Sequence, residues 1–180
     1  MDLEKFCPTH LSALPAGPAS PALVQGRFTG AAEFSELIRT AFSAAASEGW
    51  REIIISDSSF EDWPLGERRV AQALNDWSGA GRKLTMLAKT YTEVTRRHAR
   101  FVSWRRTWAH LVECRGNSAL SADVFPSALW SPVYVFQRLD LRHCSGIAGA
   151  EAARRVALRE QLDECLRRSS PAFPATTLGI

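Results

Sequence analysis

Residues 133–140 read Val-Tyr-Val-Phe-Gln-Arg-Leu-Asp, a run of β-branched and aromatic residues that closes on a carboxylate. This composition is typical of a strand with a packed face, so we predict a strand over residues 133–139. Side chains two positions apart point the same way in a strand, so Val133 and Val135 are expected to face the core together. Small residues follow and predict a turn with a return strand: Ser145, Gly146, Ala148 and Gly149.

The spacing resembles the motif of the phospholipase D superfamily, in which His, any residue, Lys, four residues and Asp lie on a buried strand. Val133 stands where the nucleophilic His would be, Val135 where the phosphate-binding Lys would be, and Asp140 matches the motif. The resemblance implies the scaffold without its chemistry, because a lost His removes the covalent route and a lost Lys removes a stabilising cation. It also implies that two such halves pair, so we expect a homodimer through this strand. The alternative is an ordinary Val-rich strand that ends in Asp.

The rest of the chain alternates between predicted strands (23–28, 52–56, 83–88, 112–114) and predicted helices (34–45, 66–77, 92–111, 150–168). Right-handed crossovers make neighbouring strands parallel. We therefore expect an α/β fold resembling a phospholipase D half, with a mostly parallel sheet flanked by helices on both faces. Pro126 and Pro132 are expected to break the chain between strands, and the Pro-containing tail from Ser169 to be irregular. A flexible Pro-rich arm, residues 1–21, would precede a single domain over residues 22–180.

The composition is that of an ordinary globular protein, with 46% hydrophobic and 23% charged residues and a net charge of +3. No apolar run reaches the roughly 18 residues that a bilayer span needs, and the first residues lack a signal-peptide pattern, so cytoplasmic location is the expectation. No paired metal-ligand or cofactor motif is present, so neither a metal nor a cofactor is predicted. The cysteines show no regular spacing and are expected to be reduced and mostly buried: Cys7, Cys114, Cys144 and Cys165.

An acidic loop follows the predicted strand at residues 52–56 and contains Asp57, Glu61, Asp62 and Trp63. Open α/β sheets bind ligands at the carboxyl ends of their strands, so this loop is a candidate site for a cation or a basic partner. The alternative, which we favour, is turn chemistry and helix capping, with Trp63 packed on the sheet.

The predicted helix over residues 92–111 is rich in arginine and in aromatic residues, a combination that suits nucleic acid or a weak anionic ligand. The aromatics lie on one helical stripe, which predicts that they are buried and that Arg96, Arg97, Arg100, Arg105 and Arg106 form a solvated rim. Nucleic-acid binding is therefore not the favoured interpretation. His98 falls on the same stripe, where a core histidine with a backbone partner is expected. The alternative is an enzyme near Asp57, with His98 as the base and arginines holding phosphate.

Four segments resemble an uncharacterised family of bacterial proteins, in some of which a similar domain follows an acetyltransferase domain: residues 57–68, 96–101, 126–132 and 170–179. The resemblance implies no reaction. Taken together, these features predict a non-catalytic binding or interaction module with a homodimer or protein partner. The candidate ligand or anion site comprises Asp57, Asp62, Trp63, Arg97, His98, Arg100 and Asp140.

Overall fold

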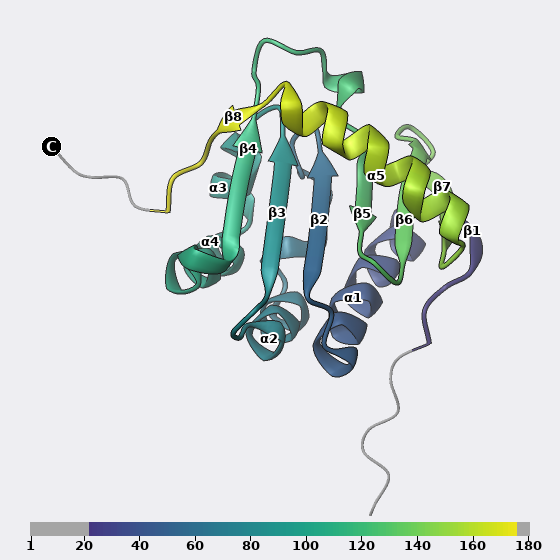
Figure 1. Ribbon diagram of the computed structural model, residues 1–180, viewed down its shortest axis with the longest axis horizontal. Helices are drawn as coiled ribbons and strands as arrows, with labels where there is room; N and C mark the ends of the chain where they lie inside the picture. The colour runs from purple at the N-terminus through teal and green to yellow at the C-terminus, as the bar shows by residue number, and fades with distance from the viewer. Residues whose placement is uncertain (1–21, 176–180) are drawn as a thin grey trace, which may run out of the picture.

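One mixed β-sheet organises residues 22–175, the part of the chain that the computed structural model describes (Figure 1). Its strand order is β1-β7-β6-β5-β2-β3-β4-β8. The strands are β1 (Gly26–Thr29), β2 (Glu52–Asp57), β3 (Lys83–Ala88), β4 (Val112–Gly116), β5 (Ser127–Trp130), β6 (Val135–Asp140), β7 (Ser145–Gly149) and β8 (Ser170–Pro171). The predicted arm (1–21) and the end of the tail (176–180) lie outside the described residues.

Helices cover both faces of the sheet, as predicted (Figure 1). Helix α5 crosses one face, and α1 to α4 pack on the other. The α-helices are α1 (Ala31–Glu48), α2 (Arg68–Trp77), α3 (Thr92–Arg97), α4 (Ala99–Thr107) and α5 (Ala152–Arg167), and the short 3-10 helices are η1 (Pro64–Gly66), η2 (Ala109–Leu111) and η3 (Ala122–Val124).

The prediction of a mostly parallel sheet is wrong. Of the seven strand pairings within residues 22–175, only β2–β3 and β3–β4 are parallel, and five are antiparallel. Helical crossovers join β2 to β3 and β3 to β4, whereas short turns join β5, β6 and β7, and a short turn can connect only antiparallel neighbours. Strand β5 occupies the segment that Pro126 and Pro132 were expected to break. Strand β8 falls in the tail that was expected to be irregular, where it pairs with the edge of β4.

Strand β6 corrects two further expectations. It begins at Val135, and Val133 is 47% exposed in the preceding turn, so Val133 is not a core-facing strand residue. Val135 is fully buried on the face covered by α5. Both edges of β6 are paired, with β5 and with β7. A dimer cannot form by strand pairing through β6, because no free edge remains.

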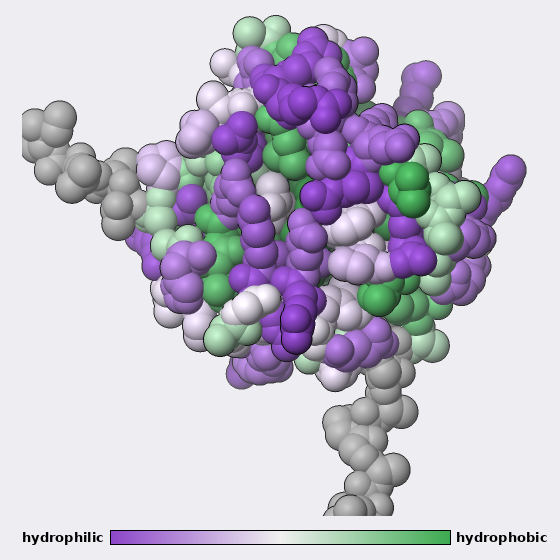
Figure 2. Space-filling view, viewed as in Figure 1, coloured by the Kyte–Doolittle hydropathy of each residue, from purple (hydrophilic) through white to green (hydrophobic). Residues whose placement is uncertain are grey.

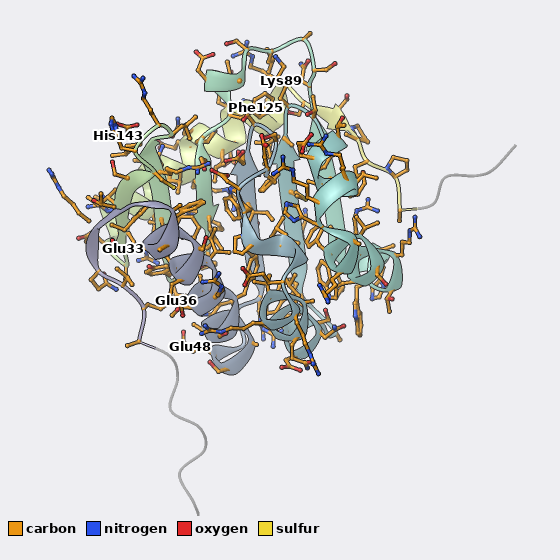
Figure 3. All side chains as sticks on the ribbon, turned by 180° about the vertical axis from the view of Figure 1, so that it is seen from behind. Glu33, Glu36, Glu48, Lys89, Phe125 and His143 are labelled. Carbon is orange, nitrogen blue, oxygen red and sulfur yellow. The ribbon has the colours of Figure 1, made fainter. Side chains whose placement is uncertain are left out.

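The strand directions bring distant parts of the chain to one edge. Strand β5 is antiparallel to both β2 and β6, so β6 runs in the same direction as β2. The carboxyl ends of β2, β3, β4 and β6 therefore meet at a single edge, which we call the carboxyl edge. Lys89 and Phe125 lie along this edge, and His143 lies toward its far end beyond β6 (Figure 3). This edge is where the candidate residues from β2 and β6 can meet.

The sheet face under α5 is only partly covered by that helix. Charged side chains fill the remainder and pair with one another: Lys83 Nζ lies 3.0 Å from Glu113 Oε2, and Arg159 Nη1 lies 3.1 Å from Glu52 Oε1. Figure 2 shows hydrophilic residues over this part of the face. Because these charges are satisfied internally, the face is a solvated surface and not a strong candidate for ligand binding.

Candidate functional site at the carboxyl edge

The loop after β2 is held by the carboxylate of Asp57, the last residue of that strand and only 3% exposed. Its Oδ1 accepts hydrogen bonds from the backbone N–H groups of Ser59 and Phe60, both at 3.0 Å. Its Oδ2 accepts a hydrogen bond from Nε1 of Trp63 at 3.1 Å. Phe60 has a φ of 59°, a conformation that costs energy for a non-glycine residue and that these contacts hold in place. The interpretation of Asp57 as a turn residue is thus confirmed.

Arg138 of β6 reaches the same loop from across the sheet and is 6% exposed. Its Nη2 donates to Oδ2 of Asp57 at 3.0 Å and to Oδ1 of Asp62 at 3.2 Å. Its Nη1 donates to Oδ2 of Asp62 and to Sγ of Cys144, the latter at 3.4 Å. Its Nε donates to Oγ of Ser127 at 3.1 Å. One side chain therefore joins β5, β6, the β2 loop and the β6–β7 turn.

Strand alternation sets the direction of the Arg138 side chain, and a glycine and a β-bulge lie next to it. Gly146 pairs with Arg138 in the β6–β7 ladder, and a Cβ atom on Gly146 would lie 2.8 Å from the Cα atom of Arg138, so only glycine fits. The register shifts between Arg138 and Asp140, which makes Leu139 an extra residue in the strand. Arg138 lies two residues after the buried Phe136 and faces the same side of the sheet, whereas Leu139 is 67% exposed.

The arrangement is a closed ion-pair network. All five N–H donors of the Arg138 guanidinium are used within the protein, so none is left for a phosphate group from solution. Burial of the guanidinium acts to lower the pKa of Arg138. The hydrogen bonds to Asp62 and Cys144 outweigh this effect and hold the pKa above its ordinary value. The guanidinium also lies 4.3 Å from the ring centroid of Phe34, a cation–π contact. The network stabilises the part of the carboxyl edge between β2 and β6, and its guanidinium is not free to bind a ligand.

The structure brings Asp57, Asp62 and Trp63 together through Arg138, a residue that was not among those predicted from the sequence. The signal was a single arginine inside the apolar strand 133–139. Asp140, the residue that matches the phospholipase D motif, lies outside this network. Its carboxylate accepts the backbone N–H of His143 at 2.9 Å and contacts the His143 ring at 2.8 Å, and these contacts lower the pKa of Asp140.

The remaining candidates lie beside the network. Arg97 pairs with Glu61 at 2.7 Å at the rim of a groove of about 340 Å³ above Arg138. His98 is buried, and its Nε2 lies 2.8 Å from the carbonyl oxygen of Phe60, so the prediction of a core histidine with a backbone partner is confirmed. Arg100 is exposed and donates to the carbonyl oxygen of Gly66 at 3.0 Å. His98 does not line the groove, which counts against a role as a general base there.

The Arg-rich segment is two helices and not one, because α3 ends at Arg97 and α4 begins at Ala99. Two of its three aromatic residues pack inward, as predicted: Phe101 is fully buried and Trp104 is 3% exposed. Trp108, which was expected on the same buried stripe, is only partly buried, because it lies past the end of α4. Trp104 also donates from Nε1 to Oγ of Ser78 at 3.0 Å. The rings of Phe101 and Trp104 are therefore not available to stack on bases.

Arg105 was expected on the solvated rim, and that expectation is wrong. It is 6% exposed, and its Nε donates to Sγ of Cys114 at 3.1 Å. Its guanidinium lies 4.8 Å from the ring centroid of Phe173. The segment after β8 covers this part of α4, an arrangement that no local pattern in the sequence indicates.

Three further findings concern metal ligands, cysteines and membrane-spanning helices within residues 22–175. No group of three or more His, Cys, Asp or Glu side chains in this range is arranged to hold a metal ion. Three cysteines, Cys114, Cys144 and Cys165, are free and buried, as predicted for them, while Cys7 lies outside the described residues. None of the described helices is long and apolar enough to cross a membrane.

No family model and no curated protein matches the sequence. Among solved structures, the chain is similar to TrmBL2, an archaeal chromatin protein whose structure is described as showing a novel mode of DNA binding. The identity is 15% and the TM-score is 0.55, over 81% of this chain and 53% of that chain. The described chain thus corresponds to about half of TrmBL2, and at this identity the likeness is one of fold.

Proposed function

We propose that this chain is a non-catalytic interaction module with a phospholipase D-like scaffold. The observation that carries the proposal is the saturation of Arg138, the buried cation at the carboxyl edge, by Asp57, Asp62, Ser127 and Cys144. A phosphodiesterase needs a cation that is free to meet a phosphate. The replacement of the motif's His and Lys by Val133 and Val135 supports the same proposal.

We expect no phosphodiesterase activity above the buffer rate on model diesters such as bis(4-nitrophenyl) phosphate. Val133 cannot form a covalent phosphoenzyme, and Val135 cannot stabilise transition-state charge. Release of nitrophenol with and without the purified protein measures this. Turnover that disappears in an Asp140→Ala variant would contradict the proposal, because Asp140 would then belong to a working site.

The exposed leucines at the carboxyl edge suggest which surface makes the interaction. Leu139 is 67% exposed and Leu141 is 55% exposed, although large apolar side chains are normally buried. Charges of both signs lie near these leucines. Arg142 follows Leu141 in the chain, and Asp62 lines the same groove as Leu141, and both charged residues are exposed. A twofold contact needs a surface that is complementary to itself, and a surface with both signs meets that requirement. We therefore propose a second copy of this chain as the partner.

We expect a dimer in solution and a monomer for the double variant Leu139→Ser/Leu141→Ser, because the variant removes the apolar part of the contact. Light scattering after size exclusion at two protein concentrations measures the mass. Val156→Ser is the matched control, since Val156 is 57% exposed but lies on α5. A wild-type monomer at high concentration, or a monomer produced by the control, would overturn the proposed contact.

A second candidate function is weak binding of nucleic acid through the outer side of α4. Arg100 and Arg106 are exposed there and have no carboxylate partner among residues 22–175. The description of TrmBL2 as a DNA-binding chromatin protein favours this candidate only by likeness of fold. Arg96 and Arg97 are already paired with acidic residues, and the rings of Phe101 and Trp104 are buried, so we rank this candidate second.

A further inference from the structure

A second groove lies on the carboxyl edge, between the ends of β3 and β4 and the segment that follows β8. It has a volume of about 520 Å³, a size that suits a small molecule. Lys89 and Thr90 follow β3, and Ser118 follows β4, so the groove occupies the position where open α/β sheets bind ligands. This groove is separate from the groove above Arg138, because the two have no lining residue in common.

The charge of this groove is not balanced. Among residues 22–175, Lys89 is the only charged residue that lines it, and no carboxylate in this range does. Among residues 22–175 the Lys89 ammonium has no ion-pair partner, whereas Lys83, at the other end of β3, pairs with Glu113 at 3.0 Å. The groove above Arg138 differs, because its arginines are paired with Asp57, Asp62 and Glu61. A lone ammonium in a concave site favours a negatively charged ligand.

Hydrogen-bond donors accompany the ammonium. Thr90, Thr92 and Ser118 line the groove, and their side-chain hydroxyls form no hydrogen bond with any residue in the range 22–175. Hydroxyl donors beside a lysine can satisfy the oxygens of a phosphate or a carboxylate. The loop that carries Lys89 is held in place, because the backbone N–H groups of Lys89 and Thr90 donate to the carbonyl oxygen of Ser58 at 3.1 and 3.2 Å.

One wall of the groove is aromatic and rigid. The ring of Phe173 stacks on that of Tyr91 with the centroids 4.9 Å apart and 6° between the planes. The Tyr91 hydroxyl lies 2.8 Å from the carbonyl oxygen of Met86 and 2.7 Å from that of Arg115, so its single O–H group can donate to either, which holds the ring in place. A Cβ atom on Gly116 would lie 3.0 Å from the carbonyl oxygen of Ala88, so this end of β4 is closely packed. The wall is preformed, and a flat ligand can lie along it.

We propose that this groove binds a small organic oxyanion, with the anionic group at Lys89 and the organic body beside Phe173. The oxygens come from a phosphate or from a carboxylate, and both present the same chemistry to an ammonium and three hydroxyls. This site is independent of the proposed self-association, which uses the Leu139 side of the edge.

Four probes test the proposal by titration of the full chain, followed by the backbone amide signals in NMR: phenyl phosphate, benzoate, inorganic phosphate and phenol. We expect phenyl phosphate or benzoate to shift the signals of Lys89, Thr90 and Ser118, and the tighter of the two identifies the anionic group. Inorganic phosphate should bind more weakly because it lacks the ring, and phenol should not bind because it is neutral. Binding of phenol as tight as that of the anions would overturn the proposal.

Lys89→Gln should weaken binding of the preferred anion about tenfold, the effect of losing one charged hydrogen bond. Lys83→Gln is the matched control and should change the affinity by less than about twofold, because Lys83 lies at the opposite end of the same strand. Phe173→Leu should reduce the preference for phenyl phosphate over inorganic phosphate while leaving inorganic phosphate binding unchanged. Equal effects of the two lysine variants, or shifts confined to other surfaces, would contradict the assignment.

Discussion

Replacing Arg138 by Met should lower the free energy of unfolding by about 3–5 kcal/mol, because it leaves the buried carboxylate of Asp57 without its cation. The substitution also leaves Asp62 and Ser127 without the donors that they accept from. Asp57 is 3% exposed, so water cannot replace the lost partner. Urea unfolding followed by circular dichroism measures the change.

Two comparisons isolate this cause. Asp62→Asn should cost only about 1 kcal/mol, because the Asp62 side chain is 51% exposed and water can compensate. Arg167→Met, which removes an arginine from an exposed pair with Glu164, should cost within about 0.5 kcal/mol. If Arg138→Met is as stable as Arg167→Met, the network does not hold the carboxyl edge together.

Truncating Trp104 to Ala should cost about 3–5 kcal/mol, because the side chain is 3% exposed and its loss opens a cavity beside Phe101. Arg106→Ala, on the exposed side of the same helix, should change stability by no more than about 0.5 kcal/mol. Thermal melts of both variants and the wild type measure these differences. A stable Trp104→Ala protein would show that this helix does not pack as the structure has it.

The Arg106→Ala variant also tests the nucleic-acid candidate. If the outer side of α4 binds DNA, Arg106→Ala should weaken the binding of single-stranded DNA, and the loss should be larger at low salt than at high salt. If the chain is an interaction module, neither the wild type nor the variant should show saturable binding near 0.15 M salt. Titrations at two salt concentrations separate these results.

Local patterns in the sequence were sufficient to place the helices and strands that have strong periodicity. The Ile-rich strand at residues 52–56, the strand at 83–88 and the helix that contains Phe34 and Phe42 were placed correctly, because each pattern repeats with the period of its own element. The burial of Phe101 and Trp104 followed from the same argument, since residues on one helical stripe must face one side. His98 lies on the same stripe, and its ring is accordingly buried with a backbone partner.

Strand direction and long-range pairing were decided only by the tertiary structure. The turn before β6 and the β6–β7 turn make the sheet mostly antiparallel, and the chirality rule for crossovers says nothing about such turns. Arg138 and Asp57 are 81 residues apart in the chain, and they meet because β6 and β2 run the same way with β5 between them. Arg105 is buried because a segment from the C-terminal part of the chain covers it. Periodicity reports which face of an element is apolar, but the partner of a buried charge depends on which elements the fold makes neighbours.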